Sequence, residues 1–219
     1  MASSDLLPRN EDVRLACAFI PDAVKRAEVL SLYAFIDTLR DIPERVTEPL
    51  MGETRLRWWY EAIEEIRDGR TVRYHPLTEK LKDLIMKYGL VSQAFLDMIE
   101  GQMPLLDKGP LSIKTALGVV DSGEGVIARL AATILGQNGN LMPWARLYGM
   151  AHLKARRGLI DVGDTEWAHL RRDTKGAVAG DLLPLALPAA LAGDLWRGRE
   201  TGPLAKRFKL LWAFLTGRI

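Results

Sequence analysis

The sequence has a single cysteine, Cys17, and no apolar run long enough to cross a membrane. One cysteine excludes an internal disulfide framework and a zinc site built from several cysteines, and it is typical of a reducing compartment. Residues 1–14 lack the basic and apolar regions of a signal peptide. The longest apolar stretch, residues 182–193, is about half a membrane span and contains prolines. We therefore expect a cytoplasmic protein that contacts a membrane at most peripherally.

An excess of either charge is also missing. The 30 Lys and Arg residues nearly balance the 28 Asp and Glu residues, so the formal net charge is +2 at pH 7. Because no strong basic field surrounds such a chain, we expect no nucleic-acid partner. The histidines His75, His152 and His169 show no spacing that would bring them to one metal ion.

Strand-like alternation of apolar and polar residues is absent as well, and apolar residues recur instead at helical spacing. Examples are Val24, Ala27, Leu30 and Ala34, followed by Leu56, Trp59, Ile63 and Ile66. Proline and glycine residues interrupt this pattern and separate roughly eight helices. A length of 219 residues, of which 48% are hydrophobic, suits one domain. The sequence predicts an all-α, single-domain helical bundle over residues 1–219.

An acidic row occurs in residues 32–44, which read LYAFIDTLRDIPE. Asp37 and Asp41 are four residues apart on a predicted helix, and Glu44 follows three residues later. Such carboxylates can hold Mg²⁺ against a diphosphate. The row is equally typical of a solvated helix edge, where Arg40 would pair with Asp37 or Glu44. Pro43 predicts that the helix ends or kinks at this point.

Two further acidic pairs are candidates for a site. Asp161 and Asp164 flank Gly163, a pattern that predicts a turn and the start of a helix. Asp121 and Glu124 lie in a glycine-containing helical segment. They are compatible with a replacement metal site, with polar lining of an apolar cavity, or with solvent exposure at a helix break.

Two basic segments are also candidates for a function. The run KARR at residues 154–157 could contact a phosphate or a lipid headgroup, and a solvated helix face is its commoner explanation. The segment 205–219 is basic and amphipathic, and it carries Phe208, Leu211, Trp212 and Leu215 on one side. An anionic membrane surface is one possible contact for that side, and docking on the core is the commoner one.

Five segments, taken in order, resemble the squalene/phytoene synthase family. They are residues 14–42, RLRWW at 55–59, AFLDMIEG at 94–101, residues 119–136 and the tail from residue 183. The resemblance covers nearly the whole chain and implies the isoprenoid-synthase fold, an all-α bundle around a central cavity. In that family two aspartate-rich helices face each other across the cavity, bind Mg²⁺ and hold prenyl diphosphates that are condensed head to head.

The resemblance implies a set of site residues for an active enzyme. Asp37, Asp41 and Glu44 would form one Mg²⁺ platform, Asp161 and Asp164 would form the other, and Arg40, Arg55 and Arg57 would bind the substrate diphosphate. The reaction would be that of a Mg²⁺-dependent prenyltransferase, and Mg²⁺ would be its cofactor. No residue is assigned as the catalytic group.

The motifs depart from the family pattern where the metal ligands are expected. When the first acidic motif is aligned with that of the family without gaps, Arg40 and Asp41 take the positions of two adjacent aspartates. Leu105 takes the position of another aspartate of the family. A guanidinium in the place of a metal ligand would repel Mg²⁺. These departures favour a family member whose aspartate-rich motifs have degraded.

Residues 45–59, RVTEPLMGETRLRWW, resemble one branch of the family in particular. That branch includes the mitochondrial respiratory complex I assembly factor and its bacterial relatives, and it carries the signature SEP-x-x-GE-x-RL-x-WW with Thr47 here in place of serine. The resemblance implies a non-catalytic assembly protein, or one that binds an isoprenoid or lipid, with a respiratory-complex partner and a place peripheral to the inner membrane. The prenyltransferase acting on prenyl diphosphates stays open as the alternative.

Overall fold

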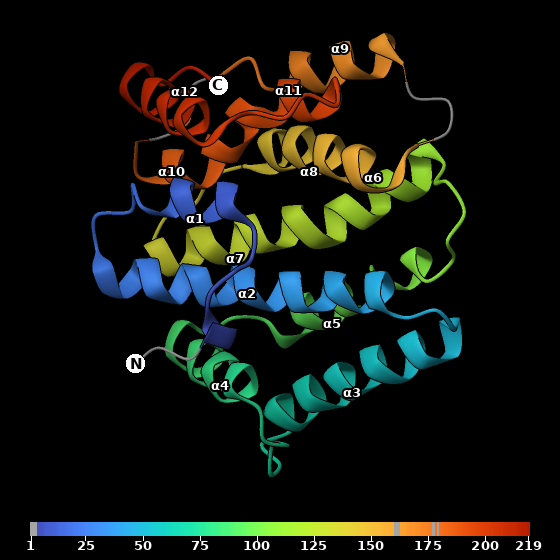
Figure 1. Ribbon diagram of the computed structural model, residues 1–219. Helices are drawn as coiled ribbons and strands as arrows, with labels where there is room; N and C mark the ends of the chain where they lie inside the picture. Colours follow the sequence, from blue (N-terminus) through green and yellow to red (C-terminus); the bar gives the residue numbers. More distant parts are fainter. Residues whose placement is uncertain (1–3, 160–162, 177, 179) are drawn as a thin grey trace.

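The computed structural model describes residues 4–159, 163–176, 178 and 180–219, and within these residues it contains helices and no β-strand (Figure 1). The prediction of an all-α fold is therefore confirmed. The α-helices are α1 (Glu11–Cys17), α2 (Ala23–Arg45), α3 (Pro49–Arg67), α4 (Pro76–Tyr88), α5 (Ser92–Glu100), α6 (Ile113–Val120), α7 (Val126–Leu135), α8 (Met142–Arg157), α9 (Asp164–Asp173), α10 (Leu183–Ala186), α11 (Ala192–Trp196) and α12 (Pro203–Thr216). The 3₁₀ turns are Ser4–Leu6, Met103–Leu105, Gly180–Leu182 and Leu187–Leu191.

Helix α2 runs through the middle of the bundle beside α7, with α3 and α4 on one side and α8, α11 and α12 on the other (Figure 1). It begins where the Asp22 carboxylate caps the backbone N–H groups of Val24 and Lys25 at 2.8 and 3.0 Å. Neighbouring helices surround α2 on several sides. Its buried apolar residues therefore lie on more than one face of the helix.

The C-terminal end of α2 differs from the prediction. The helix continues through Pro43 to Arg45 instead of ending at the proline. Pro43 removes one intrahelical N–H bond, only two helical residues follow it, and its ring is buried. Glu44 therefore remains on the same helix as Asp41.

Helices α6 and α7 form one continuous helical run that is interrupted by a π-helical turn at Asp121–Gly125. The backbone at the two ends of the π-turn, at Val120 and Val126, has right-handed helical φ and ψ angles. The helical run therefore continues through the turn. A π-turn adds one residue per turn and rotates the side chains at that level, and such turns are frequent at functional sites. Here it sets the direction of the Glu124 side chain.

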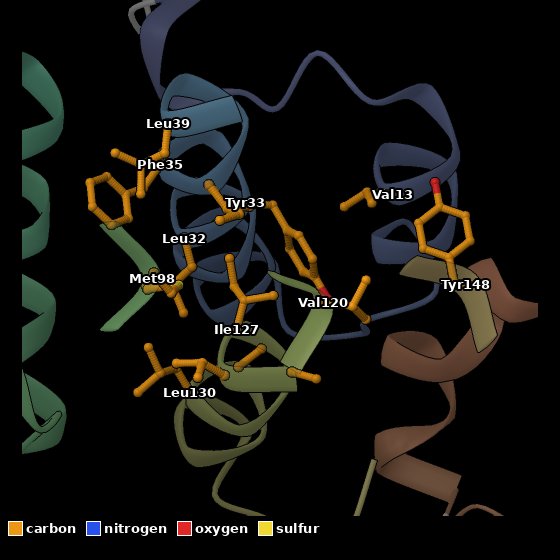
Figure 2. Close-up of a cluster of buried hydrophobic side chains, with 14 of the residues drawn as sticks. Val13, Leu32, Tyr33, Phe35, Leu39, Met98, Val120, Ile127, Leu130 and Tyr148 are labelled. Carbon is orange, nitrogen blue, oxygen red and sulfur yellow. The ribbon is translucent and has the colours of Figure 1, made fainter. Parts of the chain in front are cut away.

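The core joins α2, α5 and α7. Figure 2 shows Leu32 of α2, Met98 of α5 and Ile127 of α7 in one buried cluster. Trp59 of α3 also packs into this core, with its ring 5.5 Å from that of Phe35. Full burial of such side chains contributes about 1.5–3 kcal/mol each.

The C-terminal region is more broken than the expectation of roughly eight helices. Pro184 and Pro188 divide residues 183–196 into the short helices α10 and α11 with a 3₁₀ turn between them. Helix α12 then docks on a second apolar cluster through Leu210 and Ala213. Among the described helices, none combines the length and the apolar character that spanning a bilayer requires.

Candidate functional site

The acidic row of α2 lines an open groove of about 380 Å³. Asp37, Arg40, Asp41 and Glu44 all border it, and the opposite wall includes His152 and Arg156 of α8. The four α2 residues come together because spacings of three and four residues place side chains on one helix face. The structure thus brings these four predicted residues to one place.

Each carboxylate of the row has an arginine partner. Asp37 lies 3.5 Å from Arg40 and also accepts a hydrogen bond of 3.0 Å from the backbone N–H of Asn10. Asp41 pairs with Arg9 and, at 3.2 Å, with Arg45. Glu44 pairs with Arg156 of α8. Every acidic group that was predicted on this helix therefore has its charge balanced by the protein itself.

Arg40 also reaches across the interior to Glu124 on the π-turn. The two side chains form an ion pair, and they are only 11% and 13% exposed. Burial lowers the pKa of the Arg40 guanidinium, but Glu124 and Asp37 outweigh this effect and the net pKa is raised. Arg40 is therefore a permanent cation held between two carboxylates.

Gly149 of α8 makes room for this ion pair. A Cβ atom at this position would lie 2.9 Å from the Glu124 carboxyl carbon and 2.7 Å from a methyl carbon of Val120. Both distances are shorter than real Cβ contacts, so a larger residue would force the carboxylate to move.

The ion pair lies between two small cavities. One, of about 40 Å³, is lined by residues including Gln102, Leu105 and His152, and the other, of about 30 Å³, is lined by residues including Tyr33 and Tyr148. Arg40 and Glu124 border both cavities. Since a water needs about 10–15 Å³ by this measure, each cavity has room for a few waters. The predicted central cavity is thus present in two parts, and Glu124 is its polar lining.

The first cavity contains unpaired polar atoms. Among the described residues, Gln102 Oε1 and Arg157 Nη2 are buried and have no hydrogen-bond partner. His152 faces the same space, and burial, with a smaller contribution from the Arg40 guanidinium, lowers the pKa of His152 to about 4. The imidazole is therefore neutral at pH 7.

The remaining predicted residues lie elsewhere. Arg55 and Arg57 are exposed on α3, where Arg57 lies 3.8 Å from Glu61 and borders a different groove from that of Arg40. Asp164 is the exposed first residue of α9, so the predicted helix start is found there, with Gly163 at the N-cap position. Asp161 lies outside the described residues.

Several residues of the site were missed or undervalued by the sequence reasoning. Arg9 and Gln102 carry no motif, and their positions depend on tertiary packing. Arg156 and Arg157 belong to the KARR run, which was interpreted as a solvated face, yet both border the first cavity. Only the basic run itself pointed to these two arginines in the sequence. Arg156 pairs with Glu44 and Arg157 donates to the Leu105 carbonyl, and both partners are distant in sequence.

A metal centre requires several His, Cys, Asp or Glu side chains that converge on one point. Within the described part of the chain, no group of three or more His, Cys, Asp or Glu side chains is placed to hold a metal ion. Asp37, Asp41 and Glu44 instead pair with arginines.

The all-α bundle with an acidic helix beside a central cavity defines the class of the protein, which is the isoprenoid-synthase fold. A sequence model of the squalene/phytoene synthase family matches residues 9–155, which include the whole acidic row and the π-turn. The chain therefore belongs to the squalene/phytoene synthase family. No curated protein sequence matches the chain.

Proposed function

We propose that this protein is a non-catalytic member of its family that works by binding a partner, as an assembly protein does. The buried Arg40–Glu124 ion pair carries the proposal. It places a permanent cation and its counter-charge where the family chemistry needs an open, dry cavity for a carbocation. The proposal extends to a respiratory-complex subunit as the partner, on the basis of the signature in residues 45–59.

The charges in the groove support this proposal because they do not fit Mg²⁺. A hard dication needs several free carboxylate oxygens, whereas Asp37, Asp41 and Glu44 are each paired with an arginine. A dication would have to displace these guanidinium groups, including that of Arg40, whose side chain is only 11% exposed and is paired with Glu124.

The size of the interior points in the same direction. Head-to-head condensation requires space for two prenyl chains, and the two cavities of about 40 and 30 Å³ each hold only a few waters. An isoprenoid or lipid ligand would likewise have to open them. Binding of a protein at the surface requires no such rearrangement.

The signature segment divides into buried and exposed residues. Leu56 and Trp59 are in the core, and Gly52 packs so closely that a Cβ atom would lie 2.2 Å from a methyl carbon of Leu106. Glu53 and Arg55 are exposed on α3. Burial explains the first three residues as fold determinants, and the exposed charges are available to a partner.

The prenyltransferase is the second candidate, and one observation favours it. Asp37, Asp41 and Glu44 share one groove next to a cavity. A large rearrangement of the arginines on substrate binding would convert this groove into a Mg²⁺ site.

The test incubates the purified protein with farnesyl or geranylgeranyl diphosphate, with and without Mg²⁺, and measures diphosphate release and the thermal unfolding midpoint. We expect no release and no Mg²⁺-dependent shift. Release that is abolished by Asp41→Ala, but not by the control Asp83→Ala at an exposed aspartate of α4, would establish the enzyme. A shift with the prenyl diphosphate alone would instead indicate a ligand-binding role.

The assembly role needs a separate measurement. Tagged protein is purified from its own cells, and the co-purified proteins are identified by mass spectrometry. The proposal expects a respiratory-complex subunit, whose recovery falls in Glu53→Ala/Arg55→Ala and persists in the exposed control pair Lys82→Ala/Asp83→Ala. Recovery of no respiratory subunit contradicts this part of the proposal.

A further inference from the structure

Helix α12 has two apolar faces. One packs into the second apolar cluster, where Leu210 and Ala213 are buried and the Phe214 ring lies 4.6 Å from that of Phe19. The other face is open to solvent. It carries Leu204, Phe208, Leu211, Trp212 and Leu215, which are 80%, 66%, 45%, 59% and 71% exposed. The side of the helix that was expected to dock on the core is therefore the side that is free.

The exposed apolar residues form one stripe. At about 100° per residue they cover an arc of roughly 100°, and Leu210 and Ala213 lie on the opposite side of the helix. The Phe208 and Trp212 rings are stacked, with their centroids 6.4 Å apart and their planes 18° from parallel. Exposed apolar groups that are gathered in this way mark a contact surface, whereas isolated ones do not.

Positive charge accompanies this stripe. Residues 197–219 contain six Lys and Arg residues and one acidic residue, Glu200. Lys206 and Lys209 turn toward the protein, where they pair with Asp12 and Asp194. Four cations remain at exposed positions, namely Arg197, Arg199, Arg207 and Arg218. Of these, Arg207 lies on α12 next to the stripe, at about 40° from Leu211, and Arg218 follows the end of the helix, so the apolar stripe has basic residues at its edge.

We propose that the exposed face of α12 docks on the surface of an anionic lipid bilayer. A helix with an apolar stripe and flanking basic residues lies in the membrane interface with its apolar side chains below the headgroups. Tryptophan prefers that depth, which suits Trp212. A second copy of this chain fits less well, because a symmetric contact would bring the same arginines together. This surface does not depend on whether the cavity is catalytic.

The test mixes the full-length protein with vesicles and measures the bound fraction by flotation. The vesicles contain either phosphatidylcholine alone or equal parts of phosphatidylcholine and phosphatidylglycerol. We expect binding to the anionic vesicles only. Binding should weaken between about 0.1 M and about 1 M salt, because the screening length falls from about 10 Å to about 3 Å. Arg207→Gln/Arg218→Gln should lower the partition coefficient by about fivefold per arginine.

A matched pair of variants separates this face from a general effect of charge. Phe208→Glu/Leu215→Glu should reduce binding by at least about tenfold. Leu50→Glu/Met86→Glu introduces the same charges at residues that are 72% and 74% exposed on α3 and α4, at the other end of the molecule, and should leave binding nearly unchanged (Figure 1). Circular dichroism checks that both variants fold.

Three results would overturn the proposal. They are an absence of binding to anionic vesicles, an equal loss in the two double variants, and equal binding to neutral and anionic vesicles. Self-association that Phe208→Glu/Leu215→Glu abolishes, without any vesicle binding, would assign the face to a second copy of the chain.

Discussion

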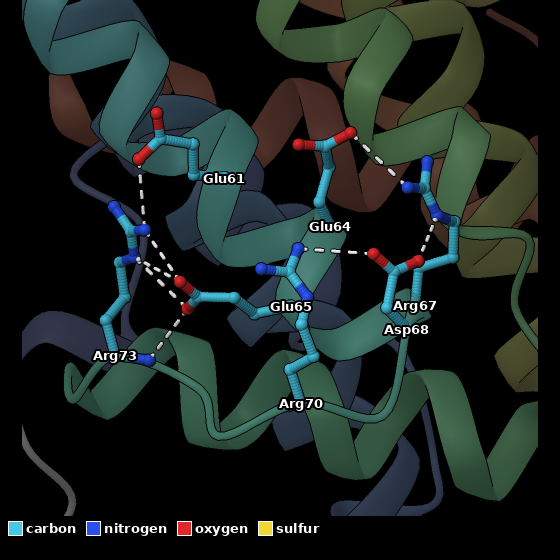
Figure 3. A network of polar contacts seen from close by, with 7 residues as sticks. All are labelled: Glu61, Glu64, Glu65, Arg67, Asp68, Arg70 and Arg73. Carbon is cyan, nitrogen blue, oxygen red and sulfur yellow. Dashed lines mark hydrogen bonds and ion pairs between the residues drawn. The ribbon is translucent and has the colours of Figure 1, made fainter.

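Two networks of arginines and carboxylates in this protein have similar chemistry and different surroundings. Figure 3 shows the first, at the C-terminal end of α3, where Arg73 lies 2.7 Å from Glu65 and 3.0 Å from Glu61. The second joins Arg40 to Asp37 and Glu124 in the interior. In the first network Glu65 is 13% exposed, but Arg73 and Glu61 are 26% and 46% exposed. In the second, Arg40 and Glu124 are 11% and 13% exposed.

Burial changes what such a network does. The network on α3 ties down the chain that follows the helix, since Glu65 also accepts a hydrogen bond of 2.9 Å from the Arg73 backbone N–H. Partly exposed ion pairs such as that of Arg73 with Glu61 contribute little to stability, because water screens them. The interior pair is largely shielded from bulk solvent, so breaking it leaves a poorly compensated charge. Its main consequence is the shape of the cavity, which it divides.

The largest effect is expected when the interior network is broken on one side. Arg40→Leu should lower the free energy of unfolding by about 3 kcal/mol, because Glu124 and Asp37 stay buried without their cation. Urea denaturation at pH 7 measures this value. The control is Arg40→Leu/Glu124→Leu, which removes both charges and should recover most of the loss. A single variant that loses less than about 1 kcal/mol would contradict the role given to burial.

The next effect concerns the neutral histidine beside the interior network. The folded-state pKa of His152 is about 4, below the ordinary histidine value of 6.5, so between these two values the unfolded chain binds more protons. This group therefore destabilises the protein as the pH falls from 6.5 toward 4, by about 2 kcal/mol at pH 5 relative to pH 7.

Urea denaturation of wild type and His152→Gln at pH 7 and pH 5 isolates this effect. The variant should lose less stability on acidification than wild type, by the same amount of about 2 kcal/mol. His169→Gln, at an exposed histidine of α9, serves as the control and should behave as wild type does. Identical pH dependence in all three proteins would mean that the imidazole is not held neutral.

The smallest effect is expected in the network at the C-terminal end of α3, which is the more exposed of the two. Arg73→Gln should lower the free energy of unfolding by about 1 kcal/mol, and this loss should shrink as salt is raised to about 1 M, because the ions screen the exposed pairs. Denaturation of wild type and of Arg73→Gln at two salt concentrations tests it. The loss in Arg40→Leu should stay nearly constant over the same range. Equal salt dependence at the two sites would remove the distinction between them.

The local parts of the site could be predicted because their causes are local. Asp37, Asp41 and Glu44 share a face because a helix brings residues three and four apart together, and Pro43 lies too near the helix end to change this. The start of α9 was predicted from Gly163 and the aspartates beside it, and α9 begins at Asp164 with Gly163 at the N-cap position. Trp59 is in the core, as its apolar spacing indicated.

The pairings could not be predicted in the same way. Three alternatives were open for Glu124, and its choice of Arg40 depends on how α2 packs against the π-turn. Arg156 looked like a solvated residue until α8 was placed beside Glu44. In each case the partners are far apart in sequence, so no spacing rule connects them.

Helix α12 separates the two kinds of information most clearly. The spacing of its apolar residues determines that it is an amphipathic helix, because residues three and four apart lie on the same face. It does not determine which stripe is buried, because Leu210 with Ala213 and Phe208 with Leu215 are both apolar. That choice depends on the shape of the surface formed by α1 and the 3₁₀ turn Leu187–Leu191, which accepts the narrower stripe and leaves the wider one to solvent. The sequence thus determined the helices and their acidic row, whereas packing between distant segments decided which charges met and which apolar face stayed free.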